Sequence, residues 1–326
     1  CALPILLGVP SPRAVHAKLL AARATGIDRL SALGGLANTT ATPYWPNPVA
    51  LQAAQFLPDQ PVEEALGAFA RRLVGPARAT DLVQAWADFE EAVMWQPFIP
   101  LFSVFGFCWQ RSWDRPFVPD LEAVPAAERE YYARHGCFQF NNPGLNDLGK
   151  DVLFDLITRD SGAKMAADMD REVLPRMRAL IERLAPTAAT EPVFRDLRDR
   201  ARAFLAWATT MRNFCVWCET VYGWLDPKSD AATRAACERK LQDAIDLELA
   251  NTRDLLDLVE NSPTETIAIS TVSETTFVYG ENLADHLRTK LRLTEKYRHH
   301  PPRIDRNIYW RPAPGTHWPE GWSTEE

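Results

Sequence analysis

The chain has no long apolar run. The longest apolar stretches among its 326 residues cover positions 2–9 and, with interruptions, positions 98–109. A membrane-spanning helix needs roughly 18 or more consecutive apolar residues, so no such helix is predicted. We therefore expect a soluble protein without a membrane partner, and the sequence leaves a cytoplasmic and an exported location equally open.

The chain also lacks the short motifs that mark common cofactor, nucleophile and metal sites. It contains no GxGxxG fingerprint, Walker loop, GxSxG elbow, HExxH helix or zinc-ribbon spacing. Its six cysteines are scattered, and its single CxxC lies inside a long helical pattern, so Cys215 and Cys218 are predicted to be core residues. No cofactor and no metal are predicted, and the motifs leave the catalytic residues unknown.

Positive charge is in the minority. The chain has 36 Lys and Arg residues against 43 Asp and Glu residues, which gives a formal net charge of −7. This balance excludes a protein that coats nucleic acid phosphates. The fractions of hydrophobic residues (46%) and charged residues (24%) are those of an ordinary globular protein, which excludes a disordered or collagen-like chain.

The first 47 residues differ in pattern from the rest. An apolar run at 2–9 predicts a buried strand, Ser11 and Pro12 begin a helix that ends at Gly26, and 27–33 is predicted to be a second strand. Two parallel strands need neighbouring strands and cover on both faces. Because position 1 is Cys instead of Met, we expect residues 1–47 to be the last units of a truncated (β/α)8 barrel.

Residues 48–326 have a mainly helical pattern. Helices are predicted at about 61–73, 80–95, 165–184, 191–224, 230–260 and 282–298. Six prolines between 96 and 146 predict long loops there, rich in Pro and Trp. The predicted fold class is thus mainly α, with a short strand-helix-strand remnant of a (β/α)8 barrel followed by a multi-helix domain.

Aromatic residues are the main pointer to a binding site. Several of the eleven tryptophans stand beside Pro, Asn, Gln or Arg, which is typical of sugar-binding loops and also of rings that fill seams between helices. Positions 9–11 and 33–45 follow the two predicted strands, and ligands bind at that end of a parallel sheet. The residues predicted to bind substrate are Asn38, Tyr44, Trp45, Trp109 and Trp113.

The order of six short segments carries a resemblance to a known group of proteins. The segments are Val9-Pro10-Ser11-Pro12 leading into Lys18-Leu19, Gly26-Ile27, Pro46-Asn47-Pro48, Glu64-Ala65-Leu66 through Gly75, Ala85-Trp86 with Phe89 and Glu91-Ala92, and Ile304-Asp305 with Tyr309-Trp310. This order resembles the carboxy-terminal part of uncharacterised bacterial proteins of the glycoside-hydrolase type, in which a (β/α)8 barrel precedes a helical domain. The resemblance implies a carbohydrate-active hydrolase with a carbohydrate substrate, and a homo-oligomer formed through the helical domain.

The resemblance assigns no catalytic group. Glycosidases generally use two carboxyl groups across the scissile bond, and in a truncated chain both could lie upstream. The visible acidic residues have simpler interpretations, and Glu90 and Glu91 are expected on a solvated helix face. Enzyme activity is therefore expected only if a complete barrel is present.

A second interpretation stays open. Residues 48–326 would form a non-enzymatic helical module that binds a partner protein through an exposed aromatic patch, with the first 35 residues docked on it. A helical enzyme that uses buried His and Asp groups has less support, because no such pair stands at a ligand-like spacing on an apolar face.

Overall fold

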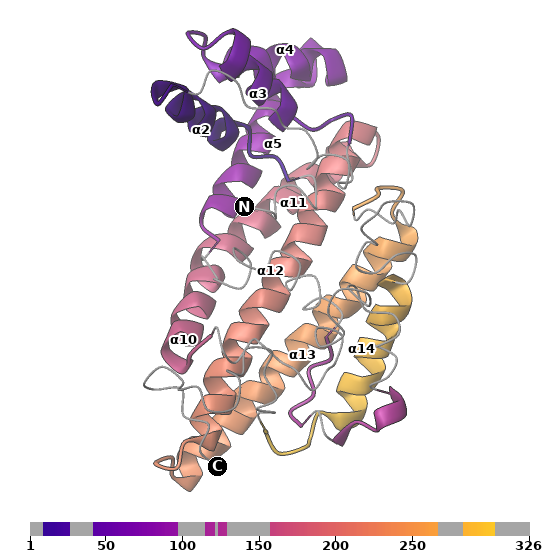
Figure 1. The fold of residues 1–326 in the computed structure, drawn as a ribbon. Helices are drawn as coiled ribbons and strands as arrows, with labels where there is room; N and C mark the ends of the chain where they lie inside the picture. The colour runs from indigo at the N-terminus through magenta and orange to yellow at the C-terminus, as the bar shows by residue number, and fades with distance from the viewer. Residues whose placement is uncertain are drawn as a thin grey trace. The chain divides into compact units, whose positions relative to one another are not determined.

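The computed structural model describes residues 9–26, 42–96, 115–120, 123–128, 157–266 and 283–303. These ranges contain nine α-helices and one π-helical turn, and no strand (Figure 1). The predicted mainly α fold is confirmed for this part of the chain. Contacts divide the chain into two compact units, and the two longest helices contribute residues to both.

Unit 1 comprises Cys1–Phe98, Ala167–Thr209 and Asp257–Ala268. Its described elements are α2 (Pro12–Ala24), α3 (Asn47–Phe56), α4 (Val62–Val74), α5 (Pro76–Met94), the π-helical turn η3 (Met169–Val173), α11 (Leu174–Ala188) and the first half of α12 (Pro192–Leu225). In this unit α4 and α11 both pack against α5, and α2 packs against α3.

Local signals in the sequence account for the bounds of α4 and the start of α5. Glu63 and Glu64 lie in the first turn of α4, and Arg71 and Arg72 lie in its last turn, so both pairs match the helix dipole. Gly75 then takes a φ of 75°, a conformation that is open to glycine and strained for other residues. This residue lets the chain turn directly from α4 into α5.

An aromatic core holds unit 1 together. Phe69 stacks on Trp86 with ring centroids 5.8 Å apart. Phe89 meets Phe204 edge-on at 5.7 Å, and Phe204 lies 5.7 Å from Trp207. All five side chains are buried, and their ring contacts join α4 to α5 and α5 to α12.

The N-terminus of α2 is capped by a residue from another helix. Ser11 makes no side-chain capping bond. Instead the carboxylate of Glu90 on α5 accepts hydrogen bonds from the backbone N–H groups of Arg13 (3.2 Å) and Ala14 (2.7 Å). Glu90 is only 5% exposed, so the expectation of a solvated face is wrong for this residue.

The predicted barrel is also wrong, because α2 belongs to a helical layer. It packs against α3, and its Arg23 donates hydrogen bonds to the carbonyl groups of Ala54 and Gln55 at the end of that helix. The described residues show no sheet for α2 to cover. The predicted strands at 2–9 and 27–33 lie outside the described residues except for Val9, so the strand-helix-strand remnant is not shown.

Unit 2 comprises Ile99–Ala166, Thr210–Leu256 and Ile269–Glu326. Its described elements are most of α10 (Arg159–Asp168), the second half of α12, most of α13 (Ala231–Asn261) and α14 (Leu283–Tyr297), together with 115–120 and 123–128. Within this unit α12 and α13 run antiparallel, because Glu219 pairs with Lys240 while Thr210 bonds Glu248. The two long helices predicted at about 191–224 and 230–260 are thus present and form an antiparallel pair in this unit.

Two close contacts build unit 2. Gly162 of α10 lies so near α12 that a Cβ atom there would come within 2.6 Å of the carbonyl oxygen of Cys215, so a larger residue does not fit. The segments around Val118 and Val124 pack against Leu293 and Tyr297 of α14. The first contact is a close backbone approach, and the second is packing between buried apolar side chains.

Candidate functional site

The described parts of the two segments predicted to form the ligand side, 9–11 and 42–45, meet in unit 1 with the start of α3. The side-chain oxygen of Asn47 accepts a hydrogen bond from the backbone N–H of Ser11 (2.7 Å), and its amide group donates to the carbonyl of Val9 (3.2 Å). The indole N–H of Trp45 donates to the same carbonyl at 3.1 Å. Residues 9–11 are thus held by the turn that begins α3.

The predicted substrate-binding residues differ in what they can do. Trp45 is only 8% exposed, its indole N–H is bonded to the carbonyl of Val9, and it lines the same surface hollow as Tyr44. Tyr44 is half-buried and lines a surface hollow. Asn38, Trp109 and Trp113 lie outside the described residues.

The hollow beside Tyr44 has an empty volume of about 230 Å³, including its part open to solvent. Its described lining is Pro10, Thr42, Tyr44, Trp45, Pro46, Trp86, Val193, Asp196, Leu197 and Arg200. Arg200 donates to both carboxylate oxygens of Asp196, at 2.9 and 3.1 Å, and the hydroxyl of Thr42 donates to the same carboxylate at 3.2 Å. The wall of the hollow therefore contains an ion pair whose two charges neutralise each other. The side chain of Arg200 is only 4% exposed.

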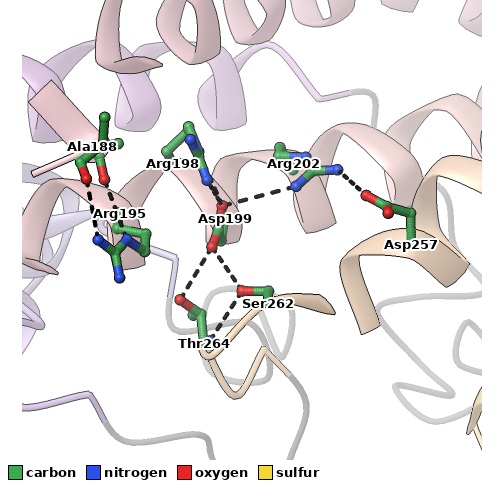
Figure 2. A network of polar contacts seen from close by, with 9 residues as sticks. Ala188, Arg195, Arg198, Asp199, Arg202, Asp257, Ser262 and Thr264 are labelled. Carbon is green, nitrogen blue, oxygen red and sulfur yellow. Dashed lines mark hydrogen bonds and ion pairs between the residues drawn. The ribbon is translucent and has the colours of Figure 1, made fainter. Parts of the chain in front are cut away.

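A second carboxylate on α12 fixes the chain that follows α13. Figure 2 shows Asp199 accepting hydrogen bonds from the hydroxyls of Ser262 (2.7 Å) and Thr264 (3.4 Å), with Arg198 on its other oxygen at 2.8 Å. Arg202 pairs with Asp257 at the end of α13. Asp199 thus holds the turn that follows α13 against α12.

An exposed apolar pair marks the end of α5. Met94 is 65% exposed and Trp95 is 49% exposed. The guanidinium of Arg176 on α11 lies over the Trp95 ring, 5.4 Å from its centroid. We call Glu91, Met94, Trp95 and Arg176 the Trp95 patch.

The Trp95 patch is held by its charged members. Arg176 donates to the carboxylate and the carbonyl of Glu172 and to the carboxylate of Glu91 at 3.3 Å. Glu91 stands one turn before Trp95 on α5, and Glu172 stands one turn before Arg176. Hydrogen bonding by these carboxylates raises the pKa of Arg176, which stays charged in any case.

The sequence signals explain why this pair is left at the surface. The buried stripe of α5 includes Phe89 and Ala92, and Met94 and Trp95 lie off that stripe. Trp95 was recognisable in the sequence as one of the tryptophans beside a glutamine. Its exposure could not be predicted, because it depends on where α11 packs.

The cysteine pair is confirmed as part of the core. Cys215 and Cys218 are both fully buried, free thiols on α12. Burial raises the pKa of Cys215 to about 12, so its thiol is protonated and unreactive at neutral pH.

Two further classes of site are not found in the described ranges. No group of three or more His, Cys, Asp or Glu side chains in them is arranged to hold a metal ion. None of the helices described there is both long and apolar enough to cross a membrane.

No protein family model matches the chain, and searches of curated proteins and of solved structures gave no match either. The resemblance to glycoside hydrolases is wrong. It implied a (β/α)8 barrel before a helical domain, whereas the described part of the chain contains helices and no strand, and α2 packs on α3.

Proposed function

We propose that this chain is a helical protein-interaction module and that the Trp95 patch is its contact surface. The observation that carries this proposal is a half-exposed tryptophan that an arginine covers on one face and a methionine adjoins in the sequence. Trp and Arg are the residues most enriched among those that dominate protein–protein binding energy. Met adapts its shape to different apolar partners.

The patch is ordered before a partner arrives. Arg176 is held by Glu172 and Glu91, so the indole of Trp95 rests on a fixed support. Fewer side-chain conformations are then lost on binding, which favours affinity. Since the charges are already paired with one another, the matching partner surface is a protein segment with an apolar anchor side chain and no excess charge.

Photo-crosslinking tests this proposal. A photoreactive amino acid replaces Met94 in the full chain, expressed in its source cells, and a matched chain carries it at Leu247, which is 50% exposed and lies on α13 in the other unit. We expect one discrete cross-linked protein from position 94 that is absent from position 247, and that purified protein should bind the purified chain. The same products from both positions, or no binding by the purified protein, would exclude the proposal.

Carbohydrate binding at the hollow is the second candidate. Tyr44 and Asp196 line the same hollow, and the bond from the Thr42 hydroxyl to the Asp196 carboxylate is the kind of contact a sugar hydroxyl makes. Hydrolysis is a further step that needs two carboxyl groups, and Asp196 is the one carboxylate in the described lining. The predicted hydrolase activity therefore stays a prediction.

A glycan array tests whether the hollow beside Tyr44 binds a carbohydrate. Tyr44→Ala keeps the buried contacts of Trp45 and removes the ring at the hollow, so a sugar that binds the natural chain there should be lost from this variant. Equal glycan signals from both chains, including no signal from either, would exclude the hollow as a sugar site.

A further inference from the structure

Unit 2 contains a charge pair that is buried almost completely. The ammonium group of Lys290 on α14 contacts the carboxylate of Glu248 on α13, and their side chains are 2% and 1% exposed. Taking two charges out of water is costly unless their geometry and further hydrogen bonds compensate.

Three helices meet at the Glu248 carboxylate. One oxygen accepts the hydroxyl of Thr210 at 2.7 Å, and the other accepts the amide of Asn213 at 2.8 Å, both from α12. Asn251 in turn donates to the Thr210 hydroxyl at 3.0 Å. These bonds from α12 and α13 fix the position of the Glu248 carboxylate. A cationic side chain of α14 must therefore reach that one position to pair with it.

One lysine on the buried face of α14 reaches this carboxylate. Its buried residues are Leu283, His286, Leu287, Lys290, Leu293, Thr294 and Tyr297. Lys290 is the one lysine or arginine in this set, and it lies in the middle of the stripe. Its ammonium group also lies 5.5 Å from the ring centroid of Phe117.

α14 and α13 run antiparallel, side by side in Figure 1, since Asp246 pairs with Arg298 while Glu248 pairs with Lys290. A slip of α14 by three residues would put Leu287 or Leu293 opposite Glu248. The carboxylate would then be buried without its cation, which is strongly unfavourable.

We propose that Glu248 and Lys290 form an ionic lock that sets the register of α14 against α12 and α13. The three leucines of the stripe supply apolar contacts, which specify a register less sharply than a buried charge pair does. The ion pair therefore selects one register. A single buried polar contact that specifies register is the best-attested use of such groups.

The test measures register directly. Spin-labelled unnatural amino acids at the exposed positions Asp243 on α13 and Arg288 on α14 leave the natural cysteines in place, and pulsed electron resonance gives the distance between them. The variant Glu248→Gln with Lys290→Met removes both charges, while the glutamine keeps an acceptor and a donor for Asn213 and Thr210. We expect one narrow distance in the natural chain and a second population in the variant, displaced by about 5 Å per helical turn of slip.

A matched control uses an exposed pair between the same helices. Arg253→Gln with Glu295→Gln removes an ion pair whose side chains are 57% and 47% exposed, and it should leave the single distance unchanged. One unchanged distance in the double variant at 248 and 290 would overturn the proposal, because packing alone would then set the register. Loss of its helical circular dichroism would overturn it as well, since the pair would then be needed for folding itself.

Discussion

The guanidinium of Arg176 lies over the indole of Trp95, with its Cζ atom 5.4 Å from the ring centroid. This contact joins the end of α5 to α11 and leaves the Trp95 side chain about half exposed. An exposed tryptophan held in one orientation is well suited to binding and contributes little to folding. The two roles can be separated by mutation.

Two tryptophans on or beside α5 should differ sharply in their effect on stability. Trp86 is 1% exposed and stacks on Phe69, so Trp86→Ala should lower the free energy of unfolding by about 3–5 kcal/mol. Trp95→Ala should change it by less than about 1 kcal/mol, because little buried area is lost. Urea unfolding measures both. A large loss in Trp95→Ala would identify Trp95 as a core residue and remove the basis for the patch.

Glu90 should give unit 1 a distinctive pH dependence. Burial raises the pKa of Glu90 above its ordinary value of 4.5, although the N–H groups of Ala14 and Arg13 oppose the shift. The folded chain therefore binds a proton more tightly than the unfolded chain, and the contribution of Glu90 to stability grows as pH falls through its folded pKa.

The control variant for this pH effect is Glu90→Gln, which cannot titrate. We expect the free energy of unfolding of the natural chain to rise relative to Glu90→Gln as pH falls from 7 toward 4.5, measured by urea unfolding at each pH. If this difference stays constant with pH or falls with acid, the N–H groups at the start of α2 affect the pKa of Glu90 at least as strongly as its burial does.

Glu128 should behave in the opposite way in unit 2. Partial burial disfavours its charge, but hydrogen bonds from Lys296 and Arg292 of α14 outweigh this and lower the pKa of Glu128. Its stabilising contribution is present above pH 4.5 and is lost as pH falls through the lower, folded pKa. Hydrogen exchange of α14 amides should quicken in Glu128→Gln at pH 7 and match the natural chain below the folded pKa. Equal exchange at pH 7 would show that this exposed contact does not hold α14.

Asn47 should matter to stability more than its size indicates. Asn47→Ala removes the acceptor of the buried Ser11 N–H and one donor to Val9, so we expect a loss of about 1–3 kcal/mol in the free energy of unfolding. Asn261→Ala serves as the control, since that asparagine is exposed and bonds Asp257 at the surface. Urea unfolding measures both losses. Similar small losses in the two variants would contradict the role of Asn47 in holding residues 9–11.

Helices with a continuous apolar stripe were predictable from the sequence. The predicted 191–224 and 230–260 correspond to α12 (Pro192–Leu225) and α13 (Ala231–Asn261), because both have regular stripes and a Pro-containing turn lies between them. Periodicity within one segment is a local property, and it survives in the folded chain. The barrel prediction failed at α2 for the opposite reason, since the partner of a helix is a property of the whole fold, and α2 packs on α3.

The buried charges were not predictable for the same reason. Glu90 stands beside Glu91, a pair that is typical of a solvated face, and only the approach of α2 explains its burial. Lys290 interrupts an apolar stripe, and its partner Glu248 is 42 residues away in sequence. Trp45 was recognised as a notable aromatic residue, but its hydrogen bond to the carbonyl of Val9, 36 residues earlier in the sequence, follows from no local pattern.

The affinity of the cross-linked partner for Trp95→Ala shows whether the Trp95 patch is the contact surface for that partner. Calorimetric titration of the purified partner into the natural chain and into this variant should show a loss of affinity of about 30-fold, equivalent to about 2 kcal/mol. Phe56→Ala, which alters an apolar side chain that is 72% exposed at the end of α3, should bind like the natural chain. Equal affinities for the natural chain and Trp95→Ala would contradict partner binding through the Trp95 patch.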